Sequence, residues 1–323
     1  MKVVPSVSVI IPVYNAERYM ARCSRSLFGQ TMASIEYIFI DDCTPDNSIN
    51  VLHSVLSEFP HRKDSVKIIR HEKNQGVSKT RYDGIKAASG EYVIHCDADD
   101  WVELDMYESL YREAVNSKAD IVYCDVFLHF PDHVKIQHVA HYKTPQDCIE
   151  GYYKKGSFFF SSANKLVKRS LIYEHKIFPP LGINLGEDVN MMFRQLHYAR
   201  NLSYCERALY HYDLSNTQSI THSSGIRSDW EMGKLNTDDN VAFLMAHNPT
   251  KYRTTASFLK FTAKLKILRA NPHDTRLFYD TYKNCRKDVL KFTCEPLRVR
   301  LLYFCMLYCY EFLKLYQWIQ TRK

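Results

Sequence analysis

The sequence lacks the features that mark several specialised classes of protein. Only 10 of its 323 residues are Gly and 11 are Pro, while 46% are apolar and 24% are charged, which excludes a collagen-like or broadly disordered chain. It has no internal repeat and no low-complexity segment. Its ten cysteines form no CxxC pair and no metal-finger spacing, which favours reduced core thiols in a cytosolic protein over a disulfide-bonded secreted scaffold.

Long apolar runs are scarce as well. Residues 1–6 lack the charged-then-apolar layout of a signal peptide, and the apolar run that begins at Val7 is broken by Pro12. Near the C-terminus, the uncharged stretch from Leu301 to Tyr310 is ten residues long, half of the roughly 20 needed to cross a bilayer. We therefore expect a cytoplasmic protein whose membrane contact, if it has one, is peripheral and on the inner face of the cell membrane.

Positive charge is concentrated at the end of the chain. Residues 251–323 hold 16 Lys and Arg against 5 Asp and Glu, a balance of +11, whereas the first 250 residues hold 27 against 31, a balance of −4. The charged and aromatic residues around the last apolar stretch fit a helix on an anionic membrane surface, and equally a helix docked on the core. These residues are Lys291, Arg298, Arg300, Lys314, Trp318, Arg322 and Lys323. Nucleic-acid binding is not expected, because no recognisable module accompanies the charge.

Strand and helix patterns alternate through the first 125 residues. Short apolar runs typical of buried strands are separated by segments with helical spacing of apolar residues. The predicted strands are Val7–Ile11, Tyr37–Ile40, Val66–Ile69, Tyr92–Ile94 and Ile121–Cys124. This alternation predicts an α/β fold, a mostly parallel sheet flanked by helices, with ligands beyond the carboxyl ends of the strands. The chain beyond about Asn240 is predicted to be entirely helical.

An acidic cluster, Asp97-Ala-Asp-Asp100, directly follows the fourth predicted strand. Its three carboxylates repel one another, and Mg²⁺ or Mn²⁺, which prefers oxygen ligands, would compensate that repulsion and bridge to a diphosphate. The alternative is a solvated acidic turn in which Asp100 caps the next helix. The position at a strand end favours the metal site.

Further polar residues stand near other strand ends. Asp42 can accept hydrogen bonds from a base or a ribose, or else complete an Asx turn. Tyr14 offers a ring for stacking on a base, although a tyrosine there can also serve packing alone. Arg81, on the helix after the third strand, can reach a diphosphate or form a surface salt bridge.

Five motifs in this region occur in the order and spacing of the family 2 glycosyltransferases, which the chain resembles closely over about residues 5–125. They are Val9-Ile-Ile-Pro-Val-Tyr-Asn15, Ile40-Asp-Asp-Cys-Thr-Pro-Asp-Asn-Ser48, Asn74-Gln-Gly-Val-Ser-Lys-Thr-Arg81 with Gly84, Gly90-Glu-Tyr92 and Asp97-Ala-Asp-Asp100. Looser matches are Asn164-Lys-Leu166, Gly186-Glu-Asp188, Tyr210-His-Tyr212 and Ser219-Ile-Thr221. The resemblance implies the GT-A fold, a nucleotide-binding sheet with a DxD metal site. Cys43 and Tyr82 depart from it, at positions where glycine and asparagine are common.

The resemblance also implies roles for the matching residues. Those on the donor side, where the base is commonly uracil, would be Pro12, Tyr14, Asn15, Asp42, Arg81, Asp97 and Asp100. Asp99, with Asp97 beside it, would bind Mn²⁺ or Mg²⁺. Asp188 matches the family's general base and has Glu187 next to it, although two carboxylates at a helix start also suit the helix dipole. His211 is a further candidate for metal or phosphate, or else packs between its tyrosine neighbours.

The sequence therefore predicts a metal-dependent, inverting glycosyltransferase of the EC 2.4 class. It would move a hexosyl or N-acetylhexosaminyl group from a nucleotide-sugar, in particular a UDP-sugar, to a saccharide or lipid-linked saccharide in bacterial surface polysaccharide synthesis. The alternative is a catalytically silent nucleotide-sugar-binding protein on the same fold. The expected domains are residues 1–239, with donor binding in 1–125 and the acceptor site and base in 126–239, and a basic helical region over 240–323.

Overall fold

The computed structural model describes residues 4–154, 160–216, 226–270 and 275–320. Their backbone forms two compact units. The sheet unit comprises residues 1–145 and 159–219, and the helical unit comprises residues 146–158 and 220–323. All ten cysteines lie among the described residues and are free thiols, five of them buried.

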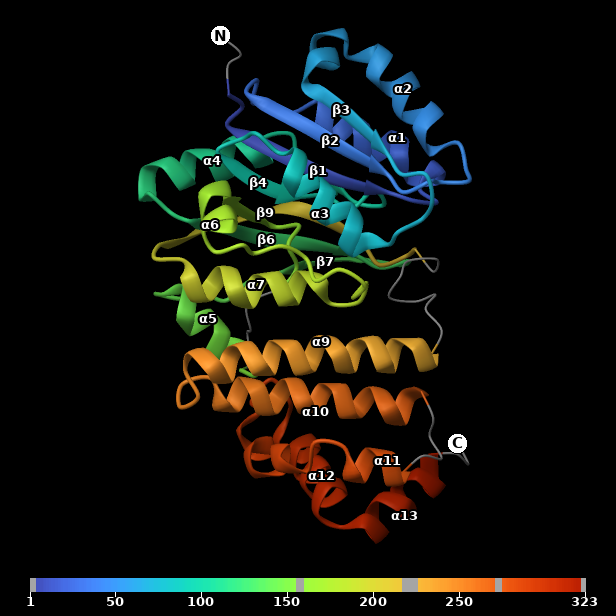
Figure 1. Ribbon diagram of the computed structural model, residues 1–323, viewed down its shortest axis with the longest axis vertical. Helices are drawn as coiled ribbons and strands as arrows, with labels where there is room; N and C mark the ends of the chain where they lie inside the picture. The colour runs from blue at the N-terminus through green and yellow to red at the C-terminus, as the bar shows by residue number, and fades with distance from the viewer. Residues whose placement is uncertain (1–3, 155–159, 217–225, 271–274, 321–323) are drawn as a thin grey trace. The chain divides into compact units, whose positions relative to one another are not determined.

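The sheet unit is built around one nine-stranded sheet. Its strands are β1 Val7–Val13, β2 Ile35–Asp41, β3 Val66–Arg70, β4 Tyr92–His95, β5 Trp101–Val102, β6 Ile121–His129, β7 Val134–Gln137, β8 Lys165–Lys168 and β9 Leu202–Asp213. They follow the order β3-β2-β1-β4-β8-β6-β9-β5, with β7 paired to β6. Figure 1 shows the first four of these strands side by side. The predicted parallel pairing is present from β3 to β4. The rest of the sheet is mixed, because β8 runs antiparallel to both β4 and β6.

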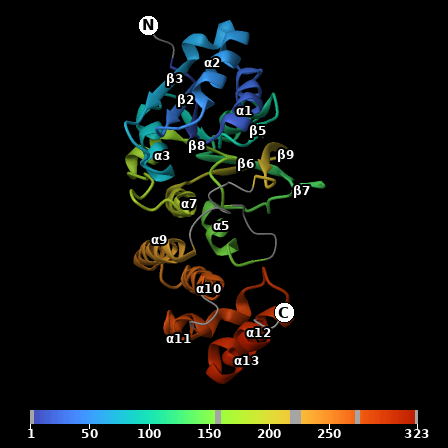
Figure 2. The same ribbon diagram turned by 90° about the vertical axis from the view of Figure 1, so that its right-hand side faces the viewer.

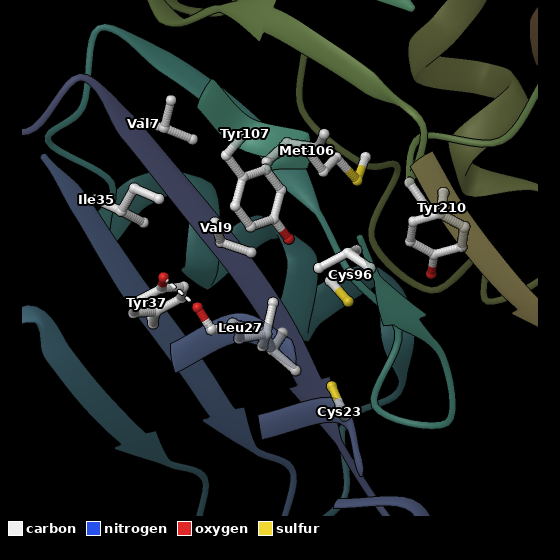
Figure 3. Packing of buried hydrophobic residues seen from close by; sticks show 14 of the residues in the cluster. Val7, Val9, Cys23, Leu27, Ile35, Tyr37, Cys96, Met106, Tyr107 and Tyr210 are labelled. Atoms are coloured by element: carbon white, nitrogen blue, oxygen red, sulfur yellow. Dashed lines mark hydrogen bonds between the residues drawn. The ribbon is translucent and has the colours of Figure 1, made fainter. Parts of the chain in front are cut away.

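Helices cover both faces of the parallel strands. The helices of the sheet unit are α1 Glu17–Phe28, α2 Ser48–Glu58, η1 Pro60–Ser65, α3 Val77–Ala87, α4 Met106–Ser117, α6 Arg169–Glu174 and α7 Glu187–Tyr198. Val9 of β1 packs with Cys23 and Leu27 of α1 in the main core (Figure 3), whereas the next residue, Ile10, lies against Gly84 of α3. Alternate residues of β1 thus face α1 and α3, which lie on opposite sides of the strand (Figure 2). Burial on both faces explains the continuous apolar runs of these strands.

The carboxyl ends of the parallel strands bring three sequence motifs to one edge of the sheet. Val13 pairs with Asp41 at the ends of β1 and β2, and β4 runs parallel to β1 on its other side. Tyr14 and Asp42 therefore follow neighbouring strands at the same edge, and Asp97 comes two residues after the end of β4. This is the edge at which the sequence predicted a ligand site.

The helical unit confirms that the described chain beyond residue 240 contains helices and no strands. Its elements are α5 Pro145–Gly151, α9 Ile226–His247, α10 Arg253–Ala270, α11 Thr275–Asp280, η2 Lys283–Lys291, α12 Leu297–Tyr308 and α13 Tyr310–Gln320. The unit begins earlier than residue 240, because α9 packs along α10 (Figure 1) and α5 is tied to α10 by a 2.8 Å hydrogen bond from Thr255 Oγ1 to the Ile149 carbonyl. No helix of the described residues has both the length and the hydropathy to cross a membrane.

The apolar segment near the C-terminus is docked on one side and exposed on the other. Met306 and Leu307 of α12 and Leu313 of α13 are buried in the core of the helical unit. Leu297 and Leu301, four residues apart on α12, are instead 60% and 49% exposed. The docked arrangement is therefore present, and it leaves an apolar strip on α12. The side chains of Trp318, Arg322 and Lys323 lie outside the described residues.

Candidate active site

The acidic cluster forms a tight turn after β4. The Asp100 amide donates to the carbonyl of Asp97, 3.1 Å away, which places the three carboxylates in different surroundings. The Asp97 side chain is 31% exposed. Asp100 is fully buried, and its carboxylate accepts hydrogen bonds from the Tyr210 hydroxyl and, at 2.8 Å, from the Asp213 amide. Asp100 thus holds the turn from inside the protein, and its predicted contact with the donor stays a prediction.

Arg81 connects the acidic cluster to the Gly186-Glu-Asp188 motif. Its buried guanidinium donates through Nη2 to Asp97 Oδ1 at 2.8 Å and through Nη1 to Glu187 Oε1. Burial disfavours the charge, but Asp97, Glu187 and Asp188 together raise the pKa of Arg81 above its ordinary value. The guanidinium of Arg81, which stays charged, therefore joins Asp97, 16 positions away in the sequence, to Glu187, 106 positions away.

The two carboxylates that begin α7, Glu187 and Asp188, both have pKa values above the ordinary ones. Burial raises the pKa of Glu187 to about 7; the nearby Arg81 opposes this rise and the charge of Asp188 adds to it. Burial also raises the pKa of Asp188. Glu187 is committed to Arg81, whereas the hydrogen bond of the Asp188 carboxylate is local, accepted by Oδ1 from the Val189 amide at 2.7 Å. Asp188 is thus the carboxylate better placed to exchange a proton with a bound molecule.

Asp99 is positioned by residues that come from distant parts of the sequence. Asn216 Nδ2 donates to Asp99 Oδ2 at 2.9 Å, and Arg22 Nη2 donates to its carbonyl at 2.8 Å. The same Arg22 nitrogen lies 2.6 Å from Asp213 Oδ2, and the guanidinium stacks over Trp101 at 3.7 Å. Burial, and then the negative charge of Asp97, raise the pKa of Asp99. A cation near this carboxylate would relieve both costs.

Asp42 holds the loop that begins α3. Its carboxylate accepts hydrogen bonds from the Gln75 and Gly76 amides, both at 2.8 Å. His71 Nδ1 lies 2.7 Å from Asp42 Oδ1, and Nε2 of the same ring lies 2.9 Å from Asp83 Oδ2. The predicted base acceptor is therefore also the residue that ties the Asn-Gln-Gly turn to the sheet edge. His71, which links the two carboxylates, was missed by sequence reasoning.

The first strand end presents an exposed ring on a strained turn. Tyr14 is 47% exposed, and Asn15 adopts a left-handed conformation with φ +52°. Pro12 precedes them inside β1, opposite Ile40 of β2. Cys43 is also left-handed, with φ +57°, which explains why glycine is common at this position in the resembled family.

Tyr82, the second departure from the family pattern, belongs to another contact. Its ring packs on Phe178 at 5.3 Å, and the ammonium of Lys79 lies 5.4 Å from its centroid. The ring thus occupies a position against Phe178, beside α3.

His211 is packed between aromatic rings other than its sequence neighbours. Trp101 and Phe127 stack on it, with centroids 4.9 and 4.4 Å away and interplanar angles of 8° and 10°. Its Nε2 lies 2.8 Å from Glu103 Oε1 and its Nδ1 lies 2.9 Å from His129 Nε2. Burial lowers the pKa of His211. Both ring nitrogens thus have protein partners, and the metal or phosphate contact stays a prediction.

The residues brought together most closely are Arg81, Asp97 and Glu187, with Asp188 adjoining. Tyr14, Asn15 and Asp42 lie along the same sheet edge but share no hydrogen bond or ion pair with that network within the described chain. No three His, Cys, Asp or Glu side chains of the described residues are grouped as a complete metal cage. Asp97 and Asp99 nevertheless fit a cation held mainly by a substrate, since Mg²⁺ usually binds one or two carboxylates together with phosphate oxygens.

Comparison with known proteins identifies the family of this chain. The model of the family described as glycosyl transferase family 2 matches residues 8–176, slightly more than half of the chain. The protein EpsH of Bacillus subtilis (strain 168) is 34% identical over 250 residues, which cover 76% of this chain and 70% of EpsH. The chain belongs to glycosyl transferase family 2. The predicted family is thus confirmed, and with it the glycosyltransferase class of enzyme.

Solved structures show that this family 2 member has the expected fold. Staphylococcus aureus TarS, residues 1–349 in complex with UDP-GlcNAc, superposes with a TM-score of 0.67 at 16% identity, covering 97% of this chain and 89% of that one. The mannosyltransferase PcManGT of Pyrobaculum calidifontis, in complex with GDP-Man and Mn²⁺, gives a TM-score of 0.58 at 12% identity, covering 98% and 88%. The α/β architecture with a helical C-terminal region is therefore confirmed.

Proposed function

We propose that the protein is an inverting, metal-dependent glycosyltransferase that uses a UDP-sugar. The observation that carries the proposal is the double contact of Arg81, which joins the donor-side Asp97 to Glu187 of the base motif. Three motifs that lie far apart in the sequence thereby become one electrostatic unit. Such a unit would supply the parts that group transfer needs, namely a cation for the diphosphate, acidic metal ligands and a carboxylate base.

The proposed donor site lies at the edge formed by β1, β2 and β4. The exposed ring of Tyr14 supports stacking on a base, and Asp42 supports recognition of base or ribose hydrogen atoms. The choice of UDP is supported by the family resemblance and by the UDP-GlcNAc bound to TarS. In this arrangement Arg81 would stabilise the diphosphate side of the donor from the start of the reaction to its end, because its charge does not change.

Asp99 and Asp97 are the residues proposed to hold Mn²⁺ or Mg²⁺. Mn²⁺ accompanies GDP-Man in PcManGT, a protein of the same fold. When bound, such a cation would neutralise charge on the departing diphosphate. The protein's own contribution is to fix Asp99 through Asn216 and to order the turn through Asp100.

Asp188 is the proposed general base. Its elevated pKa moves it toward the range in which a carboxylate accepts a proton effectively at neutral pH. Glu187 would keep Arg81 in place and, by its own charge, add to the proton affinity of its neighbour. An acceptor hydroxyl that loses its proton to Asp188 would attack the sugar opposite the diphosphate. One displacement of this kind inverts the configuration at C1.

A transfer assay with defined variants tests the proposal. UDP- and GDP-sugars are screened for hydrolysis and transfer with Mn²⁺ or Mg²⁺, using wild type, Asp99→Ala, Asp188→Asn and the exposed control Asp132→Asn. We expect Asp188→Asn to lose roughly 10²–10⁴ in kcat while still binding UDP, Asp99→Ala to lose metal-stimulated turnover, and the control to match wild type. Activity without metal, or full activity of Asp188→Asn, would refute the mechanism. UDP binding by a wild type that never turns over would instead indicate the catalytically silent alternative.

The proposed acceptor is a saccharide or a lipid-linked saccharide of bacterial surface polysaccharide synthesis. Membrane contact would bring the enzyme to a lipid-linked acceptor. The exposed Leu297 and Leu301 of α12, with the exposed Arg298 between them, support a peripheral contact with an anionic inner membrane surface. Substituting both leucines with Gln should abolish sedimentation with anionic liposomes. The same change at the exposed Leu104 of the sheet unit is the control. Unchanged sedimentation of the double variant argues against the contact.

A further inference from the structure

A depression of about 430 Å³ lies within the helical unit and is lined only by residues of that unit, among them the apolar Met245, Pro249 and Ala256. Its walls come from α9, α10 and η2, of which α10 packs on the other two. The polar lining residues are Arg253, Ser257, Lys260, Asn284, Lys287 and Asp288. The volume falls in the range of small-molecule sites, and none of these residues belongs to the proposed transfer machinery.

The spacing of these residues shows why they share one depression. Arg253, Ser257 and Lys260 stand at positions i, i+4 and i+7 of α10, which lie on one face of a helix. Lys287 and Asp288 stand close together in η2 and face them. The depression therefore collects three cationic side chains and one carboxylate.

The one carboxylate among the lining residues, Asp288, already has partners within the protein. Asp288 is 2% exposed, and its oxygens lie 2.8 Å from Ser257 Oγ, 2.9 Å from Lys291 Nζ and 3.6 Å from Arg253 Nε. Lys260 and Lys287 form no ion pair with an acidic side chain of the described residues. Lys260 and Lys287 thus line one depression without an acidic partner among the described residues, whereas Arg253 shares Asp288 with Lys291.

We infer that this depression binds a phosphate group. Phosphate oxygens match both the planar donor fork of Arg253 and the point charges of Lys260 and Lys287, and the amide of Asn284 supplies a neutral donor. The depression is larger than a phosphate ion, which leaves room for an attached glycerol or sugar. The phosphate can belong to a soluble compound or to a lipid headgroup. Because the depression shares no residue with the proposed transfer machinery or with the exposed leucines of α12, the inference stands even if either of those proposals fails.

Charge-matched variants of the full chain test the inference. Lys260→Gln/Lys287→Gln removes two charges from the depression. The control, Lys283→Gln/Lys314→Gln, removes two charges from the same unit, where each lysine is paired at 2.8 Å with Asp280 or Glu311. The single variant Lys287→Gln, at an exposed side chain, guards against a folding defect in the double variant. Unchanged melting temperatures establish that the variants remain folded.

The probes are inorganic phosphate and glycerol 1-phosphate in isothermal titration, and vesicles of phosphatidylcholine with or without about 30% phosphatidylglycerol in sedimentation. We expect the double variant to bind both soluble probes about tenfold more weakly or worse, the single variant to show a smaller loss, and the control to stay within about twofold of wild type. Affinity should also fall with ionic strength. Loss of both phosphate and phosphatidylglycerol binding identifies a lipid headgroup as the source, and loss of phosphate binding alone identifies a soluble compound. Equal phosphate affinity of wild type and double variant, or no phosphate binding by wild type, overturns the inference.

Discussion

The side-chain amide of Asn184 lies directly against the backbone of Gly76. A Cβ at Gly76 would stand 2.3 Å from Asn184 Nδ2, and Asn184 Oδ1 accepts a 3.1 Å hydrogen bond from the Ser78 amide. Asn184 therefore satisfies an amide in the first turn of α3, which has no cap from its own sequence. Since Glu187 follows three residues later, this contact also fixes the start of α7 relative to the donor-side loop.

Gly76→Ala should destabilise the protein by roughly 2–4 kcal/mol. The new methyl group would overlap the Asn184 amide, and Gly76 has φ +85°, a conformation that L residues rarely adopt. Gly182 is the matched control, because its φ is +84° and a Cβ at this position would have no atom within 4 Å. The difference between the two alanine variants in urea unfolding then measures the overlap alone. A cost at Gly76 no larger than that at Gly182 would contradict the close contact.

Arg81→Lys should reduce kcat about 10²-fold or more while the protein remains folded. A lysine keeps the charge but lacks the fork that reaches Asp97 and Glu187 at the same time. The measurement is steady-state kinetics with a thermal melt of the same preparation. Lys86→Arg, at the last turn of the same helix, serves as the control for a change between the two cations. Near-normal turnover of Arg81→Lys would show that the double contact is dispensable.

Glu187→Gln should stabilise the ligand-free protein relative to wild type, and the gain should be larger at pH 8 than at pH 5. Burial raises the pKa of Glu187 from 4.5 to about 7, so between these values the folded state holds a proton that the unfolded state releases. The contribution of Glu187 to the free energy of unfolding therefore falls as the pH rises from about 4.5 to about 7. Above pH 7 the carboxylate of wild type is charged in the folded state, and its burial destabilises the protein in full. The cost is on the order of 3 kcal/mol, and glutamine removes it.

Urea unfolding of wild type and Glu187→Gln at both pH values provides the measurement for this expectation. The same substitution at the exposed Glu174 of α6 is the control. If the difference between wild type and Glu187→Gln is the same at pH 5 and pH 8, the elevated pKa is wrong.

The parts of the fold that were predicted correctly are those governed by local periodicity. Strands β1 to β4 and the helices between them follow from short apolar runs and helical spacing, and the strand ends follow from parallel pairing. The antiparallel position of β8 between β4 and β6 was not predicted, because the sequence of a strand does not specify the strands with which it pairs. The position of a strand beside β4 depends on the path of the chain through residues 126–164.

The partners of the site residues were beyond prediction for a similar reason. Asn216 and Tyr210 hold Asp99 and Asp100 across more than a hundred positions of sequence, and no periodic signal links such pairs. His71 follows β3 directly, so its place at a strand end was the one available hint for its contact with Asp42. The stacking of His211 on Trp101 arises from the antiparallel pairing of β5 and β9, in which the two residues are direct partners.

Cys43→Gly should leave the stability unchanged or raise it by about 0.5 kcal/mol. The left-handed φ of +57° costs a side-chain-bearing residue roughly 1–2 kcal/mol, whereas glycine adopts it freely but loses about 0.5–1 kcal/mol more backbone entropy on folding. Cys43→Ala keeps the backbone strain and removes only the thiol, a weak donor whose Sγ lies 3.6 Å from the Glu72 carbonyl oxygen, so it should match wild type. Cys43→Val should be the least stable, because a β-branched side chain tolerates positive φ poorly. In urea unfolding, a stability that decreases from the Gly variant to wild type and the Ala variant, and then to the Val variant, indicates backbone strain. If the Ala and Gly variants are both less stable than wild type, the thiol and not the turn determines the residue at position 43.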